Sequence, residues 1–205
     1  MAPGELFSQR RIGLTGGIAS GKSSVGRWLA QEGLPVLDAD QFAREALEPG
    51  RDATKTVLQR YGSTVQTEGG VAIDRAALGR IVFQDPAERQ WLEQLIHPLV
   101  RKRFDQALRL HAEAPAVVLM IPLLFEAGLE SLCSEIWLVD CDESQQLERL
   151  ITRDGLSAEA AQARINAQWP LSRKRGLADH VIFNREQPGA WRAQAVDLLN
   201  QPQKN

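Results

Sequence analysis

The segment Gly16-Gly17-Ile18-Ala19-Ser20-Gly21-Lys22-Ser23 decides the fold of this chain. It fits the pattern G-x-x-x-x-G-K-[ST], whose glycines let the backbone turn tightly so that successive N–H groups point at phosphate oxygens. An apolar run precedes it and an amphipathic stretch follows it, so it lies between a strand and a helix whose amino end favours anions. We expect Lys22 to reach the β- and γ-phosphates of a nucleoside triphosphate and the Ser23 hydroxyl to ligate Mg²⁺. A glycine-rich turn that contains Lys-Ser by chance is the alternative, and the pattern alone does not identify the reaction.

Short apolar runs recur along the chain on both sides of this segment. Their length and β-branched content predict strands of a parallel sheet that is covered on both faces. The predicted strands are Ile12–Thr15, Pro35–Leu37, Ala116–Ile121, Ile136–Val139 and His180–Phe183. The amphipathic stretches between and after them predict helices at Lys22–Glu32, Asp40–Leu47, Ser144–Asp154, Ala158–Gln168 and Gly189–Leu199. We therefore expect an α/β protein.

The stretch between the second and third predicted strands differs from the rest of the chain, because its pattern predicts helices and no strand. We predict helices at Ala53–Tyr61, at Arg75–Phe83 and from Pro86 to about His111, the last one capped by Asp85. The 205 residues are thus expected to form a single domain. Its nucleotide-binding core would span about 10–50 and 114–200, and a helical insert at about 51–113 would cover a substrate site.

The composition disfavours several classes of protein. Lys and Arg number 24 against 26 Asp and Glu, a net charge of -2, which argues against a nucleic-acid surface. No apolar run approaches the roughly 20 residues that a membrane span requires, and the segment 1–11 lacks the apolar region of a secretory signal. Two cysteines are too few for a disulfide framework or a four-ligand zinc site, so we expect both to be reduced. We expect a cytoplasmic protein that binds neither nucleic acid nor membrane.

Two carboxylates, Asp38 and Asp40, follow the second predicted strand. Ligands of open α/β sheets bind at the carboxyl ends of the strands. A kinase can use a carboxylate there to orient an acceptor hydroxyl and accept its proton. Because Asp38 can also cap the following helix, Asp40 is the better candidate for the general base.

Arginines follow the fourth predicted strand. Arg149 and Arg153 lie four apart and so share a helix face, Gly155 breaks that helix, and Arg164 lies in the next one. Two helices joined at a glycine suit a lid, at about 152–168, whose closure would bring guanidinium groups onto the transferring phosphoryl group and exclude water. Arg149 is a candidate for stacking on adenine. A solvated basic face is the alternative.

Two functions remain open at this point. No segment matches the D-x-x-G and N-K-x-D patterns of GTPases, and Pro122–Glu126 lacks the Asp of a simple ATPase, so we expect a substrate-facing wall there. A kinase for a small hydroxyl or nucleoside monophosphate acceptor is one candidate. An ATP-binding regulator is another, although it would need neither the paired carboxylates nor the arginines.

Several further motifs occur in order along nearly the whole chain. They are Gly13 to Ser23, Asp38-Ala39-Asp40, Ala43-Arg44, Glu48-Pro49-Gly50, His97-Pro98, Pro122-Leu123-Leu124-Phe125-Glu126, Arg149, Arg153-Asp154, Arg164, Gln168, Ala178 to Ile182 and Asn184. Together they resemble one family, dephospho-CoA kinase, which completes coenzyme A at the expense of ATP. The phosphate loop is shared with many kinases, whereas the combination of the other motifs is far more specific.

The resemblance implies a three-layer P-loop kinase fold with a parallel sheet of order 2-3-1-4-5, a helical CoA subdomain and a lid. It implies ATP as donor, Mg²⁺, and dephospho-CoA as small-molecule acceptor. We also expect a monomer. Asp40 matches the general base and Lys22 the phosphate-binding lysine. The implied ATP-binding residues are Gly16, Gly17, Ile18, Ala19, Ser20, Gly21, Lys22, Ser23, Ser24, Arg149, Arg153, Arg164 and Asn184. The implied acceptor-side residues are Asp38, Asp40, Arg44, His97, Pro122, Leu123, Leu124, Phe125 and Glu126.

The chain departs from the family pattern at two places. Ala19 stands where the family often has Gly, and a small residue should be tolerated there if its φ is negative. Arg185-Glu186-Gln187 follow Asn184, whereas the family commonly has a Gly within two residues of that position. His97 has an alternative role as well, since a His before Pro can hold a helix bend.

Overall fold

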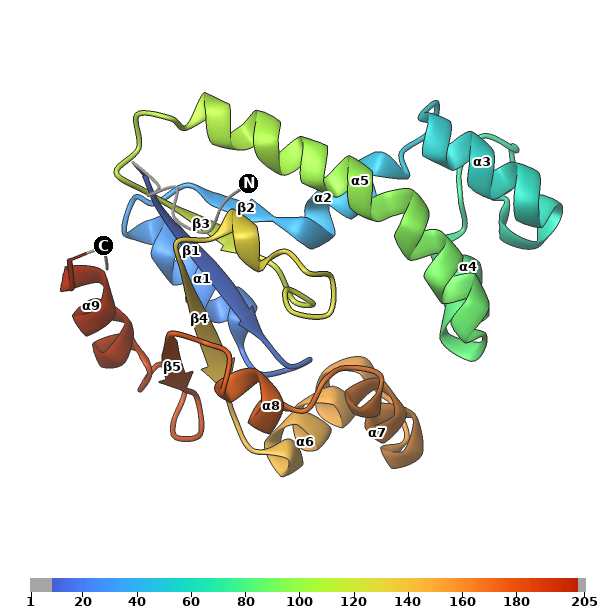
Figure 1. Ribbon diagram of the computed structural model, residues 1–205. Coiled ribbons are helices and arrows are strands. Elements are labelled where there is room, and N and C mark those ends of the chain that lie inside the picture. Colours follow the sequence, from blue (N-terminus) through green and yellow to red (C-terminus); the bar gives the residue numbers. More distant parts are fainter. Residues whose placement is uncertain (1–8, 203–205) are drawn as a thin grey trace. The chain divides into compact units, whose positions relative to one another are not determined.

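The computed structural model describes residues 9–202 and contains a five-stranded parallel sheet (Figure 1). Its strands are β1 (Arg10–Gly16), β2 (Val36–Asp38), β3 (Ala116–Met120), β4 (Glu135–Asp140) and β5 (His180–Phe183), in the order β2-β3-β1-β4-β5. All five predicted strands and the expected order are confirmed. The expectation about a secretory signal concerns residues that lie mostly outside the described range.

The helices also follow the predicted pattern, with one addition. They are α1 (Lys22–Gln31), α2 (Ala39–Ala46), α3 (Asp52–Tyr61), α4 (Arg75–Gln84), α5 (Pro86–Leu110), α6 (Glu143–Asp154), α7 (Ala158–Asn166), α8 (Leu171–Arg175) and α9 (Arg192–Asn200), with 3₁₀ turns at Gly62–Val65 and Glu130–Leu132. The short helix α8 was not predicted, because five residues are too few for a helical period to show. Within residues 9–202 no helix has the length and apolar character needed to cross a membrane.

The chain divides into two compact units. Unit 1 comprises the chain up to Asp38 and from His111 onward, and unit 2 comprises Ala39–Leu110. Unit 1 thus holds the whole sheet together with α1 and α6 to α9, whereas unit 2 consists of α2 to α5 and the turn after α3.

The core of unit 1 forms because side chains alternate along each strand. Ile12 and Leu14 of β1 and Trp137 and Val139 of β4 point to one face, where they pack with Val25 and other residues of α1 and α9. Gly26 of α1 lies so close to the sheet that an added Cβ would be 3.0 Å from the Met120 sulfur. This packing fixes α1, and hence the loop before it, against the sheet.

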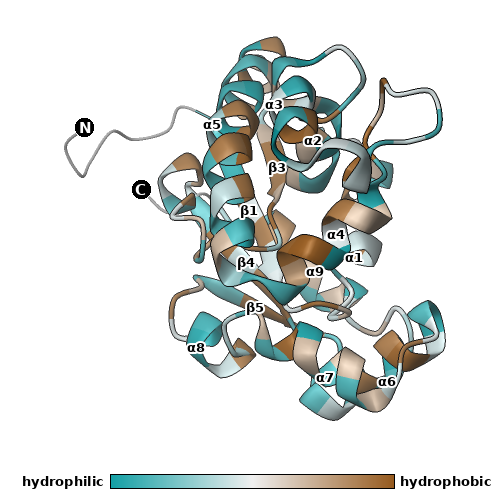
Figure 2. Cartoon of the chain, turned by 90° about the vertical axis from the view of Figure 1, so that its right-hand side faces the viewer, coloured by the Kyte–Doolittle hydropathy of each residue, from teal (hydrophilic) through white to brown (hydrophobic). Residues whose placement is uncertain are grey.

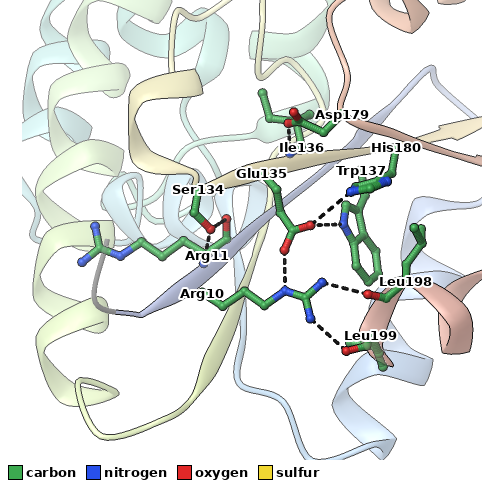
Figure 3. A network of polar contacts seen from close by, with 10 residues as sticks. All are labelled: Arg10, Arg11, Ser134, Glu135, Ile136, Trp137, Asp179, His180, Leu198 and Leu199. Carbon is green, nitrogen blue, oxygen red and sulfur yellow. Dashed lines mark hydrogen bonds and ion pairs between the residues drawn. The ribbon is translucent and has the colours of Figure 1, made fainter. Parts of the chain in front are cut away.

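A polar network joins the amino ends of β1 and β4 to the end of α9 (Figure 3). Arg10 pairs with Glu135, and its guanidinium donates to the carbonyls of Leu198 and Leu199 at 2.8 and 2.9 Å. Trp137 Nε1 donates to the second oxygen of Glu135 at 3.0 Å. The network lies at the amino ends of the strands, the edge opposite to the phosphate loop, so it stabilises the sheet rather than a site.

Unit 2 has its own apolar cluster, which includes Val57, Val65, Ile73 and Leu78. Asp85 caps α5 as predicted, since its carboxylate accepts from the amide of Ala87 at 2.8 Å. In Figure 2, α5 carries hydrophilic and hydrophobic residues side by side along its length, as an amphipathic helix does. The prediction of helices only was wrong in detail, because Gln66 and Ile73 form an isolated antiparallel bridge before α4.

Candidate active site

The phosphate loop joins β1 to α1 at the carboxyl edge of the sheet. Three side chains outside the loop hold three successive carbonyls of it. Gln146 donates to the carbonyl of Ile18 at 2.6 Å, Arg149 to that of Ala19 at 3.3 Å, and Asn184 to that of Ser20 at 2.8 Å. Because N–H and C=O point in opposite directions across a trans peptide, the amides of Ala19 and Gly21 face the inner side of the loop. Inward N–H groups are the arrangement that binds phosphate oxygens.

Two glycines make this close approach possible. A Cβ on Gly17 would collide with the carboxamide of Gln146, and a Cβ on Gly21 would collide with that of Asn184. Gly21 also has φ 105°, a backbone conformation that other residues rarely adopt. The glycines of the motif therefore serve the outer contacts of the loop as well as its tight turn.

Ala19 has φ 56°, so the condition under which we expected a non-glycine residue to be tolerated at this position is not met. No other non-glycine residue in the described part of the chain has a positive φ. The left-handed conformation costs an L-residue roughly 1–2 kcal/mol. Arg149 on the Ala19 carbonyl and Gln146 on the carbonyl before it hold the chain in this conformation.

Lys22 bends back over the loop that it follows. Its Nζ donates to the carbonyls of Gly16 and Gly17 at 3.0 and 2.8 Å. The amine thus lies at the mouth of the loop. Ser23 and Ser24 are exposed in the first turn of α1, next to the N–H groups that begin that helix.

A cavity of about 460 Å³ lies beside the phosphate loop. Arg149 and Asn184 line it together with Trp28 of α1 and Trp191 before α9, so the two predicted adenine-side residues meet at one cavity. The guanidinium of Arg149 also donates to the carbonyl of Asn184 at 3.0 Å. Trp28 is buried in the core and also forms a wall of the cavity.

In the segment after Asn184, where this chain differs from the family pattern, Arg185 pairs with Asp140. The Asp140 side chain is fully buried at the end of β4. Arg185 Nη2 lies 2.5 Å from Asp140 Oδ2, and Arg175 Nη2 lies 3.3 Å from the other oxygen. The hydrogen bond to Asp140 raises the pKa of Arg185. The ion pair thus links the loop after β5 to the end of β4. A glycine at position 185 could not form this ion pair.

The segment Pro122–Glu126 follows β3 at the same edge. Leu124 and Phe125 are buried, whereas Pro122, Leu123 and Glu126 are partly exposed. Glu126 Oε1 accepts from the backbone amide of Trp169 at 3.0 Å and lies 2.7 Å from Lys174 Nζ. Glu126 Oε2 is buried and has no hydrogen-bond partner among residues 9–202. The wall predicted from this segment is thus held from behind by α8.

The two arginines predicted to belong to a lid, Arg153 and Arg164, both pair with Asp154. Arg153 forms two hydrogen bonds to its neighbour Asp154, at 2.6 and 2.9 Å, and Arg164 Nη1 lies 3.3 Å from Asp154 Oδ2. The hydrogen bond from Arg153 lowers the pKa of Asp154. Ser157 caps α7 as its position suggests. Asp154 thus brings the two predicted arginines together, a role that the sequence analysis did not assign to it.

The remaining predicted residues lie at separate places. Asp38 is the last residue of β2, in register with Met120 of β3, and therefore lies at the carboxyl edge in unit 1. Asp40 and Arg44 lie in the first and last turns of α2 in unit 2, where the Arg44 carbonyl accepts from Arg75. His97 lies inside α5, directly before Pro98.

Sequence reasoning missed Gln146 and Lys174 as members of the site. Gln146 is spaced three and seven residues before Arg149 and Arg153, so all three share a face of α6. That spacing is the signal that could have revealed Gln146. Lys174 carries no such signal, because a lysine in a run of basic residues is usually solvated.

Known proteins resemble this chain closely. A family model described as dephospho-CoA kinase matches residues 10–188. A Synechococcus protein named dephospho-CoA kinase is 82% identical over 199 residues, which are 97% of this chain and 96% of that protein. A crystal structure of a Thermus thermophilus protein is 36% identical with a TM-score of 0.79, covering 96% of this chain and 100% of that one. The structure of dephospho-CoA kinase from Campylobacter jejuni is 29% identical with a TM-score of 0.69, covering 92% of this chain and 94% of that one.

Proposed function

The chain belongs to the dephospho-CoA kinase family and is a transferase of the final step of coenzyme A biosynthesis, and we propose that it uses ATP as the phosphoryl donor. In this reaction the ribose 3′-hydroxyl oxygen of dephospho-CoA forms a bond to the γ-phosphorus, the bond from that phosphorus to the β,γ-bridging oxygen breaks, and ADP leaves. The proposal about the donor rests on one observation above all. The phosphate loop has its carbonyls held outward by Gln146, Arg149 and Asn184.

That geometry suits a triphosphate. The amides of Ala19 and Gly21 and the amino end of α1 supply positive potential on the inner side of the loop. Lys22, which caps the carbonyls of Gly16 and Gly17 at the loop mouth, would exchange them for phosphate oxygens of the bound nucleotide. The adenine would enter the cavity lined by Arg149 and Asn184. ATP would thus lie along the carboxyl edge of the sheet.

Mg²⁺ fits the residues at the amino end of α1. No group of three or more His, Cys, Asp or Glu side chains able to hold a metal occurs within residues 9–202. Mg²⁺ usually keeps several waters and binds through substrate phosphates with few protein ligands. The exposed Ser23 hydroxyl would be the protein ligand here. The ion, when bound, would neutralise charge on the phosphates.

Asp40 would orient the acceptor hydroxyl and accept its proton as the new bond to phosphorus forms. Its place in the first turn of α2, directly after the strand that ends at Asp38, supports this role. Arg44, one turn further along the same helix, His97, Asp38 and the segment Pro122–Glu126 would bind the acceptor. Arg153 and Arg164 would leave Asp154 for the transferring phosphoryl group and exclude water.

Acceptor competition tests the proposed function. The chain is incubated with ATP, Mg²⁺ and either dephospho-CoA, AMP, CMP or shikimate, and ADP release is measured. We expect release to be fastest with dephospho-CoA, and faster release with another acceptor would overturn the proposal. The proposal also takes the enzyme to be a cytoplasmic monomer without affinity for nucleic acid. The two buried, unpaired cysteines are in keeping with a reducing compartment.

A further inference from the structure

Ile18 is distinctive within the phosphate loop, because side chains hold both of its backbone polar groups. Its amide donates to Gln168 Oε1 at 2.8 Å, and its carbonyl accepts from Gln146 Nε2 at 2.6 Å. The two glutamines come from different segments, since Gln146 belongs to α6 and Gln168 follows α7. The peptide groups on both sides of Ile18 are thus held by hydrogen bonds to side chains from outside the loop.

These two bonds orient two neighbouring peptide planes. The peptide between Gly17 and Ile18 directs its carbonyl to Lys22 at 2.8 Å and its amide to Gln168. The next peptide directs its carbonyl to Gln146, so its amide, on Ala19, faces the inner side of the loop. The two planes therefore alternate, and each is held on its outer side by one glutamine.

The loop needs such support because its own backbone preferences do not supply it. Gly17 is conformationally permissive, and Ala19 occupies the left-handed region with φ 56°. Gln146 is only 4% exposed, so its carboxamide has little access to water as an alternative partner. Its contact with Ile18 is therefore difficult to exchange for solvent.

Gln168 also connects the loop to the end of the lid. The next residue, Trp169, donates its amide to Glu126 Oε1 at 3.0 Å, and that carboxylate pairs with the fully buried Lys174. Two adjacent residues after α7 are therefore tied to two different loops, one after β1 and one after β3. This end of the lid is anchored in unit 1.

We propose that Gln146 and Gln168 are positioning residues, which act through Ile18 to present the inner amides of the phosphate loop to the nucleotide. This inference rests on the proposed function only for the identity of the nucleotide. Gln146 acts from α6 as a donor, and Gln168 acts from the anchored end of the lid as an acceptor. Neither side chain needs to touch the substrate.

Gln146 donates its hydrogen bond to Ile18, whereas Gln168 accepts one from Ile18. The same substitution, Gln to Glu, should therefore have different effects at the two positions. Gln168→Glu keeps an acceptor for the Ile18 amide, whereas Gln146→Glu replaces a donor with a carboxylate that faces the Ile18 carbonyl. We expect ADP, measured by calorimetry, to bind Gln146→Glu at least about tenfold more weakly than wild type, and Gln168→Glu within about threefold. Both variants add the same charge outside the loop, so equal losses in the two would indicate a charge effect and overturn the proposal.

A second pair of variants keeps the proposal testable if Gln146→Glu does not fold. Gln168→Leu removes the acceptor, and we expect about 5- to 20-fold weaker ADP binding, with the KM for ATP rising in parallel. The KM for dephospho-CoA at saturating ATP should change less than about twofold. Gln162→Leu is the matched control, because Gln162 lies in α7 and bonds to Glu143 and Asn166 instead of the loop. Unchanged ADP affinity in folded Gln168→Leu would overturn the proposal.

The positioning role of Gln146 and Gln168 and the proposed kinase function are tested by different measurements, so either one can fail without the other. ADP binding needs no turnover, so it decides the role of the glutamines even if wild-type protein does not phosphorylate dephospho-CoA. A merely structural role would lower the melting temperature and the active fraction of a variant. It would not produce a nucleotide-specific loss that Gln168→Glu restores.

Discussion

Lys174 Nζ lies 2.7 Å from Glu126 Oε1, and the lysine side chain is fully buried. Breaking a buried pair leaves an uncompensated charge, so we expect Lys174→Met to lower the free energy of unfolding by about 3 kcal/mol. Urea denaturation measures this change. The double variant Glu126→Gln, Lys174→Met should recover part of the loss.

Lys55→Met is the surface control for this pair. Lys55 pairs with Asp52 at a similar distance, 2.9 Å, but both side chains are mostly exposed. Because solvent screens this pair, we expect Lys55→Met to cause no measurable change in the free energy of unfolding. Equal effects of the two lysine substitutions would contradict the buried-pair interpretation.

Ala19→Gly should increase stability, which is unusual for a substitution to glycine. Glycine adopts φ 56° without the steric cost that alanine has, although its freedom in the unfolded chain offsets part of the gain. We expect up to about 1 kcal/mol of added stability, measured by urea denaturation. Ala30→Gly, inside α1, should instead cost about 1 kcal/mol. A loss of stability at both positions would disprove the strain at Ala19.

Asp40→Asn should separate chemistry from nucleotide binding. If Asp40 accepts the acceptor proton, turnover should fall by roughly 10²–10⁴-fold while the affinity for ADP stays nearly unchanged. Steady-state kinetics and calorimetry measure the two quantities. Turnover close to wild type would assign the proton to another group.

Asp154→Asn should strengthen ATP binding. Asp154 holds both Arg153 and Arg164, so a triphosphate must compete with it for the two guanidinium groups. Removing the charge while keeping a polar amide should lower the KM for ATP by about 2- to 5-fold at low salt. A higher KM would mean that Asp154 orients the arginines productively instead of competing for them.

Cys133 should be inert toward alkylating reagents in the native state. Burial, followed by the charge of Glu130, raises the pKa of its thiol to about 12, and burial also raises the pKa of Cys141. At pH 8 only about one Cys133 thiol in ten thousand would be ionised. Iodoacetamide labelling followed by mass spectrometry should therefore be slow in buffer and fast in urea.

The raised pKa of the Cys133 thiol also predicts how the free energy of unfolding varies with pH. A raised pKa means that the native protein keeps a proton that the unfolded chain releases above about pH 9. The stability contributed by the neutral thiol is therefore present below that pH and is lost as the pH rises toward 12. Cys133→Ala should flatten the decline in this window, and an unchanged slope would contradict the assignment.

Much of the fold could be predicted from local patterns in the sequence. The five strands and the phosphate loop were predictable because each is a contiguous run whose apolar residues, glycines and Lys22 lie next to one another in the chain. The strand order followed from the resemblance to a family and is confirmed by the pairing of β1 with β3 and β4.

The sequence by itself therefore determined where the phosphate loop lies and which kind of fold presents it. Only the tertiary structure decided how that loop is held. The bonds from Ile18 to Gln146 and Gln168 span 128 and 150 residues of chain, and no local pattern can specify contacts of that range. The left-handed Ala19 and the buried Lys174 were likewise beyond prediction. Their conformation and burial depend on side chains that become neighbours only when the sheet has formed.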